Sequence, residues 1–517
     1  MRRALDSAGP PVGFVMLSAM LLAPLGCGGD FLPPPGEVTG TESAPLGQVV
    51  DAVVELPFLT VAGASSAGAR LELELRIDGA GDGQHPARVR YLEATLGGQP
   101  AVLEDLSTGL TDVRVAGESW STGRIGPVSI EGAGFEFILR GTISATDRFF
   151  VEGTSWESQS GLDGTFRAWR RHRFALAGTD FFASGRVAIV ELGRGGAISV
   201  RNNLSQASSD PVLRQTGHGL FVINRFSHDN LQRLDPAANF ATSWQASTGQ
   251  GSNPHDVLLL DERKLYVTRF EPPFSDLAVL LPQGGSFRGS IPLDQLAENP
   301  DDVPTPRPDR MAHAGGVLFV GLQDVDRTFT QYGEAKLAVV DPELDEVAGV
   351  VRLGGKSPGT IETLVGTDGR ERLYVALAGI FPGLLPQELS GGIAVVDVAN
   401  RAFERWALDD DDAGGNINAF ALAREDLGYA VVSDAQYVSR LVAFDPRSGE
   451  LRRTLLETSQ FVPEIEVDSA GVLAVPDPSF VAPQLCLYRV PASADENEQP
   501  LGCVALELPP FSIEPLD

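Results

Sequence analysis

A short apolar strand recurs seven times in the last two thirds of the sequence, and this repeat limits the possible folds more than any other feature. Each copy has about five residues, mostly Leu, Val, Ile and Ala, and several copies end in Asp or Glu. The distance between the ends of neighbouring copies runs from 44 positions (Glu191 to Asp235) to 60 positions (Leu281 to Asp341). The copies are 187–191, 231–235, 277–281, 337–341, 393–397, 441–445 and 485–489.

A second apolar strand precedes six of these copies. Its central residues are Phe221, Tyr266, Phe319, Tyr374, Tyr429 and Leu473. Several strands in each repeat of this length predict a β-propeller, in which every repeat forms one four-stranded blade. We expect seven blades, with six as the alternative. The first repeat lacks inner strands, so these must come from 174–182 or from 510–517. A ring closed by strands from both ends would leave no free sheet edge.

The segment at 47–173 also consists of alternating runs, and it predicts an antiparallel β-sandwich or small barrel of about seven strands. The clearest hairpin pairs 135–144 with 149–154 across a turn at 145–148. The chain as a whole is therefore expected to be all-β. The basic run at 170–173 contains His172, which we expect to be solvated. We place the propeller at 174–517.

The first residues resemble a bacterial lipoprotein leader. Arg2 and Arg3 precede an apolar run at 12–23, which suits the core of a signal peptide and is short for a membrane span. The run ends at Pro24-Leu25-Gly26-Cys27, where Pro24 replaces the expected Leu. The resemblance implies a signal peptide at 1–26 and lipidation at Cys27. The segment that follows is rich in Gly, Thr, Ser and Pro and cannot bury a core, so it predicts a flexible tether at 27–46. The alternative is ordinary secretory cleavage near the same point.

The charge balance excludes some partners. The chain has 40 basic and 69 acidic residues, a formal net charge of −29. Such a charge argues against binding to nucleic acid or to an anionic membrane through a basic patch. We therefore expect contact with the membrane only through the lipid anchor, a monomer, and a location in the cell envelope. An outer-membrane lipoprotein could face the periplasm or the cell surface.

Two cysteines near the end predict a disulfide bond. Cys486 and Cys503 lie in two strands separated by a polar loop at 491–499. A hairpin with its turn near Ala494 and Asp495 places the two cysteines opposite each other. An export signal implies an oxidising compartment, which permits the bond.

The long loops of the repeats predict where a ligand would bind. They join strands two and three of a blade or lead from one blade to the next, so they share one face of the ring. They are 295–310, 323–335, 376–391 and 409–416. Binding residues concentrate on loops held by a rigid scaffold. We therefore predict Arg225, His255, Asp256 and Arg269 as ligand-binding residues on this face near the axis.

The acidic run at 409–412 is a candidate calcium site, with Asp409, Asp411 and Asn416 as oxygen ligands. It lacks the spacing of a dedicated calcium loop, so a solvated acidic turn is the simpler interpretation. We predict no other cofactor.

The strand Leu265-Tyr266-Val267-Thr268, with strands such as 337–341, resembles the YVTN-type and NHL-like propellers of bacterial surface proteins. The resemblance covers about 340 residues and implies a propeller fold, which hosts many activities. We expect a non-enzymatic, membrane-anchored surface or periplasmic lipoprotein that binds a protein or carbohydrate partner.

Two enzymatic functions remain as alternatives to a binding function. The first is a metal-dependent hydrolase or lactonase with its site at the propeller axis, where Asp210, Asp256, Asn418 and Asp434 are candidate ligands. The second is a quinone-dependent dehydrogenase, which the scattered positions of the five Trp residues disfavour. We predict no catalytic residue, because the sequence has no nucleophile elbow, phosphate loop or zinc-protease motif.

Overall fold

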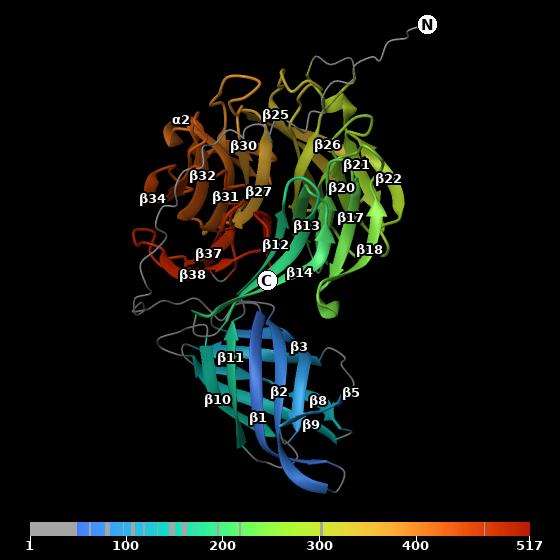
Figure 1. Cartoon of the computed structure of the whole chain (residues 1–517), viewed down its shortest axis with the longest axis vertical. Coiled ribbons are helices and arrows are strands. Elements are labelled where there is room, and N and C mark those ends of the chain that lie inside the picture. The colour runs from blue at the N-terminus through green and yellow to red at the C-terminus, as the bar shows by residue number, and fades with distance from the viewer. Residues whose placement is uncertain are drawn as a thin grey trace.

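The computed structural model shows two all-β parts, a barrel and a propeller (Figure 1). It describes residues 49–516 except 62–63, 78–82, 97, 105–108, 117–118, 132, 144–149, 158–162, 171, 194–195, 217–218, 300–302 and 470. The predicted signal peptide, Cys27 and the tether lie outside the described residues. Within the described residues, no helix has the length and apolar character needed to cross a membrane.

The first part is a closed barrel of eight antiparallel strands. Each strand pairs with the next in the order β1, β2, β3, β6, β7, β9, β10 and β11, and β11 pairs with β1 to close the ring. The eight strands are β1 (Val49–Val61), β2 (Ala64–Ile77), β3 (Gly83–Leu96), β6 (Gly109–Ala116), β7 (Ser119–Thr122), β9 (Ala133–Ile143), β10 (Phe150–Glu157) and β11 (Asp163–Arg170). Three further strands, β4 (Gln99–Pro100), β5 (Leu103–Glu104) and β8 (Ile125–Ile130), extend the sheet at its margin. Of the two architectures predicted for the segment 47–173, the structure therefore shows the small barrel.

Alternating side chains fill the interior of the barrel. Along β9, Phe135, Phe137 and Leu139 are buried while the residues between them are at least partly exposed. The ring centroids of Trp120 and Phe166 lie 5.6 Å apart inside this core. The interior is therefore a packed hydrophobic core, as expected for a barrel of eight strands.

Two glycines permit a close approach of β9 and β10. Gly141 and Gly153 are register partners in this pair. A Cβ atom on Gly153 would lie 2.1 Å from the carbonyl oxygen of Arg140, and one on Gly141 would lie 2.5 Å from that of Glu152. No larger residue fits there without moving backbone, which explains two glycines in strand interiors.

The second part is a seven-bladed β-propeller, as predicted. Seven separate sheets contain four antiparallel strands each. We number the seven blades in chain order, and we name the strands of each blade from the innermost to the outermost. Blade 1 contains β39 (Pro510–Pro515), β12 (His172–Thr179), β13 (Gly185–Leu192) and β14 (Ile198–Ala207). Blade 2 contains β15 (Pro211–Thr216), β16 (Gly219–Asn224), β17 (Asn230–Asp235) and β18 (Ala241–Ser247). Blade 3 contains β19 (Pro254–Leu259), β20 (Leu265–Arg269), β21 (Asp276–Leu280) and β22 (Phe287–Pro292). Blade 4 contains β23 (Pro308–Ala314), β24 (Val317–Leu322), β25 (Ala335–Asp341) and β26 (Glu346–Gly354). Blade 5 contains β27 (Pro358–Val365), β28 (Glu371–Leu377), β29 (Gly392–Asp397) and β30 (Ala402–Asp409). Blade 6 contains β31 (Asn416–Arg424), β32 (Leu427–Ser433), β33 (Ser439–Phe444) and β34 (Leu451–Thr458). Blade 7 contains β35 (Glu466–Val467), β36 (Val472–Asp477), β37 (Gln484–Arg489) and β38 (Gln499–Ala505).

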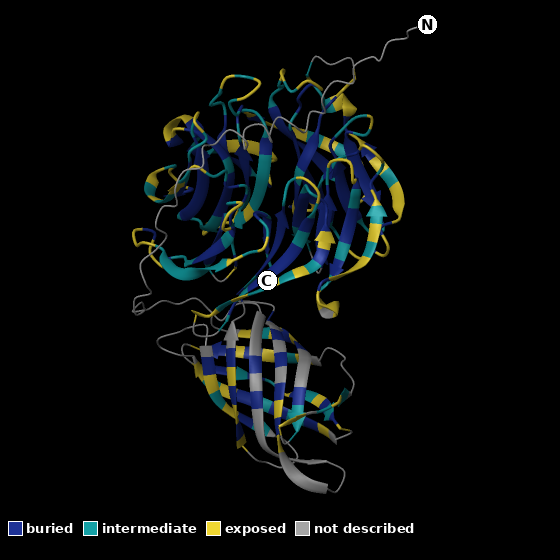
Figure 2. Cartoon of the chain, viewed as in Figure 1, coloured by how far each residue is buried: buried dark blue, intermediate teal, exposed yellow. Residues whose placement is uncertain are grey.

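All seven predicted repeat strands are the third strands of their blades, β13, β17, β21, β25, β29, β33 and β37. Most residues of the second and third strands are buried, because neighbouring blades cover both faces of each sheet (Figure 2). Outer strands alternate between exposed and covered residues, as in β26. The burial of the two middle strands explains why they read as continuous apolar runs in the sequence.

Strands from both ends of the propeller segment close the ring. The strand β39 pairs with β12, so Leu176 lies opposite Ile513 in the register. Both candidate segments named from the sequence are therefore used, one for each of the two inner strands. The solvated position expected for His172 is wrong: the side chain is buried, and its Nδ1 lies 2.6 Å from Oδ2 of Asp468 in blade 7. This contact joins the first blade to the last.

The predicted disulfide bond between Cys486 and Cys503 is also present. The two residues are register partners in β37 and β38, and their sulfur atoms are 2.07 Å apart.

The two faces of the propeller differ in their loops. The segments 323–334 and 378–391 join strands two and three of blades 4 and 5, while the matching turns at 315–316 and 366–370 on the other face are short. The loop 293–307 between blades 3 and 4, which contains the short helix η3 (Asp294–Leu296), lies on the same side as the long segments. We call this side the loop-rich face. The barrel joins the propeller at the start of β12, which lies on the opposite face (Figure 1).

Candidate functional site

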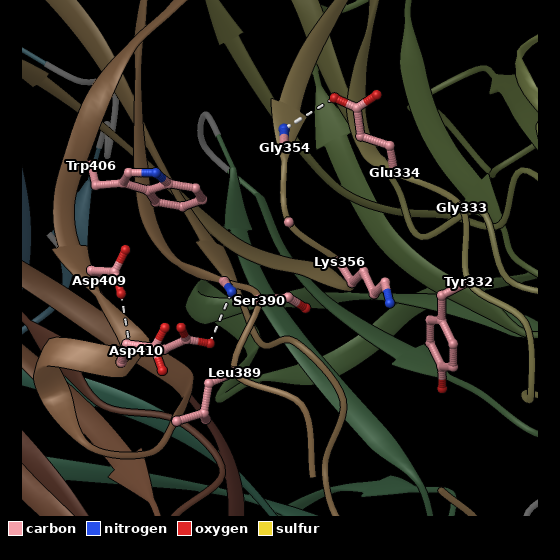
Figure 3. Close-up of a pocket in the computed structure, with 13 residues that line it drawn as sticks. Tyr332, Gly333, Glu334, Gly354, Lys356, Leu389, Ser390, Trp406, Asp409 and Asp410 are labelled. Atoms are coloured by element: carbon pink, nitrogen blue, oxygen red, sulfur yellow. Dashed lines mark hydrogen bonds between the residues drawn. The ribbon is translucent and has the colours of Figure 1, made fainter. Parts of the chain in front are cut away.

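An open pocket lies on the loop-rich face between blades 4 and 5 (Figure 3). Its volume is ≈ 510 Å³, within the range of small-molecule sites. Two of the long loops and two connections between blades supply its walls. The lining residues are Tyr332, Gly333, Glu334, Gly354, Gly355, Lys356, Leu389, Ser390, Gly391, Trp406, Asp409, Asp410 and Asp411.

The acidic turn after β30 forms one wall. Asp409 caps the single helical turn α2 (Asp410–Ala413), because its side chain accepts a hydrogen bond from the backbone N–H of Asp411 at 2.9 Å. Gly414 ends the turn in the left-handed region, with φ of 74°. The run of aspartates is therefore an ordered capping structure, with Asp409 and Asp411 at the pocket wall.

Asp410 fixes this turn to the neighbouring loop. Its side chain is buried, and Oδ2 accepts a hydrogen bond from the backbone N–H of Gly391 at 2.8 Å. A Cβ atom on Gly391 would lie 1.9 Å from the carbonyl oxygen of Leu377, so only glycine fits there. Burial raises the pKa of Asp410 to about 6, and the charges of Asp409 and Asp411 add to this effect.

The candidate calcium ligands are only partly brought together. Ligand atoms of Asp409, Asp410 and Asp411 lie within 4.8 Å of one another, the sole such group of three acidic, His or Cys residues among the described residues. Asn416 has a different role. Its amide donates to the carbonyl oxygens of Ala378 and Glu388, at 2.8 Å and 3.1 Å, and it holds the long loop of blade 5 in place.

Three of the four predicted ligand-binding residues lie on inner strands or loops near the axis, but each has a partner in the protein. Nδ1 of His255 lies 3.0 Å from Oδ1 of Asp309, and its ring stacks on Phe270 with centroids 4.0 Å apart. Asp309 is buried, which alone would raise its pKa, but His255 and Arg225 hold the pKa below its usual value. Arg225 itself pairs with Asp210 at 2.6 Å. The fourth residue, Arg269, is buried and pairs through Nε and Nη2 with Asp276, at 2.7 Å and 2.5 Å.

The third axial residue, Asp256, belongs to a buried ionic cluster that the sequence analysis missed. Arg214 on β15 is the centre of this cluster. It contacts Asp256 on β19 at 2.8 Å, Glu514 on β39 at 2.6 Å and Glu464, which precedes β35, at 3.3 Å. Arg310 on β23 contacts Glu464 as well, at 3.3 Å. Burial raises the pKa of Asp256 to about 6 in spite of Arg214, so the carboxyl group is ionised at neutral pH.

Acidic residues outnumber basic ones in this axial cluster. Burial raises the pKa of Glu362 to about 8 and that of Glu514 to about 7. Burial and the charges of Glu514, Glu464 and Glu362 also raise the pKa of Glu466 well above its usual value. A local sequence pattern does mark Glu362, Glu466 and Glu514. An Ile-Glu pair occurs at 361–362 in β27, at 513–514 in β39 and at 465–466 where β35 begins, and the three glutamates hold matching register positions.

The axial metal ligands of the alternative hydrolase hypothesis are dispersed. Asp210 pairs with Arg225, Asn418 donates to the carbonyl oxygen of Val462 at 2.8 Å, and Asp434 accepts backbone N–H groups of its own turn. Within the described part of the chain, these residues form no group of three ligands close enough for one ion.

The fold and the pocket define an all-β protein with a barrel and a seven-bladed propeller that carries a candidate binding site on its loops. No family model and no curated protein matches the sequence. Solved structures with a similar fold include a protein from Lactobacillus plantarum, with 12% identity, a TM-score of 0.48, and coverage of 67% of this chain and 100% of the other. A candidate 6-phosphogluconolactonase from Bacteroides fragilis has 12% identity, a TM-score of 0.46, and coverage of 67% and 98%. Another from Bacteroides uniformis has 14% identity, a TM-score of 0.44, and coverage of 67% and 99%.

Proposed function

We propose that this chain is a non-enzymatic binding protein of the cell envelope, anchored by a lipid at Cys27, and that it binds a protein or carbohydrate partner on the loop-rich face of the propeller. The observation that supports this proposal most is the position of the pocket. Its walls are formed by the long loops of blades 4 and 5 and by the connections around them. Long loops lose more conformational entropy than short turns when the chain folds, so their length has no benefit for stability. Contact with a partner is a functional reason for that length.

The position of the barrel fits the same proposal. The barrel joins the propeller on the face opposite the long loops. If the lipid anchor precedes the barrel, the loop-rich face can point away from the membrane and meet a partner. The disulfide bond fits an oxidising compartment outside the cytoplasm. The axial hydrolase has no comparable support, because its candidate ligands have other partners.

A photoreactive amino acid on each face tests the proposal in living cells. Leu384 lies on the loop-rich face and is 56% exposed, while Leu344 lies in a turn of the opposite face and is 67% exposed. These two leucines form a matched pair. We expect illumination to give a covalent adduct of higher mass from position 384 and none from position 344. Adducts from position 344 alone would show that the wrong face has been assigned.

A further inference from the structure

The side chains in the pocket indicate which chemical class of ligand it accepts. We propose that it binds an oligosaccharide whose sugar rings carry equatorial hydroxyl groups. This inference rests on the proposed binding function and assigns a ligand to one part of the loop-rich face. It depends on three features of the pocket: its aromatic walls, its charge balance and its open shape.

Aromatic side chains stand at two sides of the pocket. Figure 3 shows Trp406 beside the acidic turn and Tyr332 beside Lys356 on the other side. Phe403 packs edge-on against Trp406, with centroids 5.4 Å apart, and supports the indole from outside the pocket. Gly354 lies alongside the indole, where a Cβ atom would be 3.9 Å from Cζ2. A flat, partly exposed indole offers an apolar surface with a polar edge. A sugar ring with equatorial hydroxyl groups has apolar C–H faces that suit such a surface.

Most charges at the pocket are already balanced within the protein. Lys356 pairs with Glu388 at 2.6 Å, and Glu334 pairs with Arg352 at 2.6 Å. Asp410 is buried and accepts the N–H of Gly391. Asp409 and Asp411 remain as carboxylates that no basic residue of the described chain neutralises.

These two carboxylates can accept hydrogen bonds from hydroxyl groups. A carboxylate offers several acceptor positions, and Asp409 uses one oxygen for the N–H of Asp411. Neighbouring hydroxyl groups of a sugar ring are donors at a spacing that two adjacent carboxylates can accept. Pockets that combine an apolar wall with a few polar groups fix the orientation of a ligand in this way. The opening of the pocket toward solvent suits a chain of sugars that extends beyond it.

Titration of the purified chain with cellopentaose and chitopentaose tests this inference, with isothermal titration calorimetry as the readout for every variant and tryptophan fluorescence as a second readout where Trp406 is retained. We expect saturable binding of at least one of them. Trp406→Ala and Asp411→Ala should each weaken binding at least tenfold. Asp411 is exposed, so its replacement should leave the fold intact if the tryptophan variant proves unstable. The control is Phe182→Ala, because Phe182 is 68% exposed on the same face outside the pocket. Its affinity should equal that of the wild type.

Three results would overturn the inference. The first is the absence of binding to both oligosaccharides. The second is unchanged affinity in both pocket variants, which would place the sugar elsewhere. The third is a fluorescence change with calcium chloride alone and none with either sugar, which would make the pocket a cation site. An adduct at position 384 together with any of these results would preserve the binding face and reject only the saccharide.

Discussion

Arg214 is the single residue on which most of the axial contacts depend. Its guanidinium group contacts acidic residues of three other inner strands or the loops that lead into them. Arginine remains charged even when it is buried, and its planar group can serve several carboxylates at once. The residue therefore balances Asp256, Glu464 and Glu514 together. Removing it would leave buried negative charges without a partner.

The first prediction concerns this residue. Replacing one partner of a buried ionic cluster destabilises a protein by about 3–5 kcal/mol, because the remaining charges stay buried. We expect Arg214→Met to lower the free energy of unfolding by about that amount in urea titrations. Arg263→Met, in an exposed turn on the opposite face, should have little effect. Equal stability of the two variants would mean that the axial cluster adds nothing to the fold.

The raised pKa values of the axial glutamates give a second prediction, on pH dependence. The folded chain holds protons on Glu362 and Glu514 up to about pH 8 and 7, whereas in the unfolded chain these groups release them near their ordinary value of 4.5. The folded state thus binds more protons between these limits, so the free energy of unfolding rises as the pH falls through that range. We expect the melting temperature to increase from pH 8.5 to pH 6.

Glu362→Gln provides the control for this effect. The variant should melt at a higher temperature than the wild type at pH 8.5, and its melting temperature should vary less with pH. Differential scanning calorimetry at several pH values measures both. A wild-type melting temperature that falls between pH 8.5 and 6 would contradict the assignment.

At the scale of single residues, the sequence predicts where a side chain lies better than it predicts which groups that side chain contacts. His255 and Asp256 are predicted near the axis, and the structure places them there. Their partners Asp309 and Arg214 come from other blades, and no local pattern joins them. The role of a charged residue depends on what faces it across the ring. That information is spread over hundreds of positions, as with Arg214 and Glu514.

At the scale of elements, the prediction from sequence succeeds best for strands that are buried on both faces. Most of the seven third strands are rich in apolar residues because neighbouring blades enclose them, so the apolar pattern follows from the packing. The inner strands are harder to recognise. They contain charged residues such as Arg310 and Glu362, which line the axis and interrupt the apolar run. In the barrel, the alternating run at 111–120 contains parts of two strands, β6 and β7, which the alternation alone does not separate.

The hairpin of β37 and β38 gives a prediction for one element. A disulfide that closes a loop of this length, with a sequence separation of 17, stabilises a protein by about 3 kcal/mol in the chain-entropy model. We expect Cys486→Ser together with Cys503→Ser to lower the free energy of unfolding by about this amount. A digest of the unreduced wild type should show the two cysteine peptides joined in mass spectrometry. Two free thiols in that digest would contradict the structure.

At the scale of the whole molecule, the proposed lipid anchor would determine which face of the propeller points away from the membrane. The lipid at Cys27 is a prediction, and it can be tested in cells with a fatty-acid probe. We expect the wild type to be labelled and retained in the membrane fraction, and Cys27→Ser to lose the label and the retention. Equal release of both proteins into the medium would remove the anchor from the proposed function.

The closure of the ring by β39 has a consequence for how the protein is made. In chain order β39 follows every other described strand, yet its partner β12 precedes all the other propeller strands. During synthesis, the edge of β12 that β39 later covers stays unpaired until nearly the whole propeller has left the ribosome. An unpaired edge invites wrong pairing with other chains. That edge therefore needs protection until β39 is made, and a chain that ends early would leave it open to proteolysis.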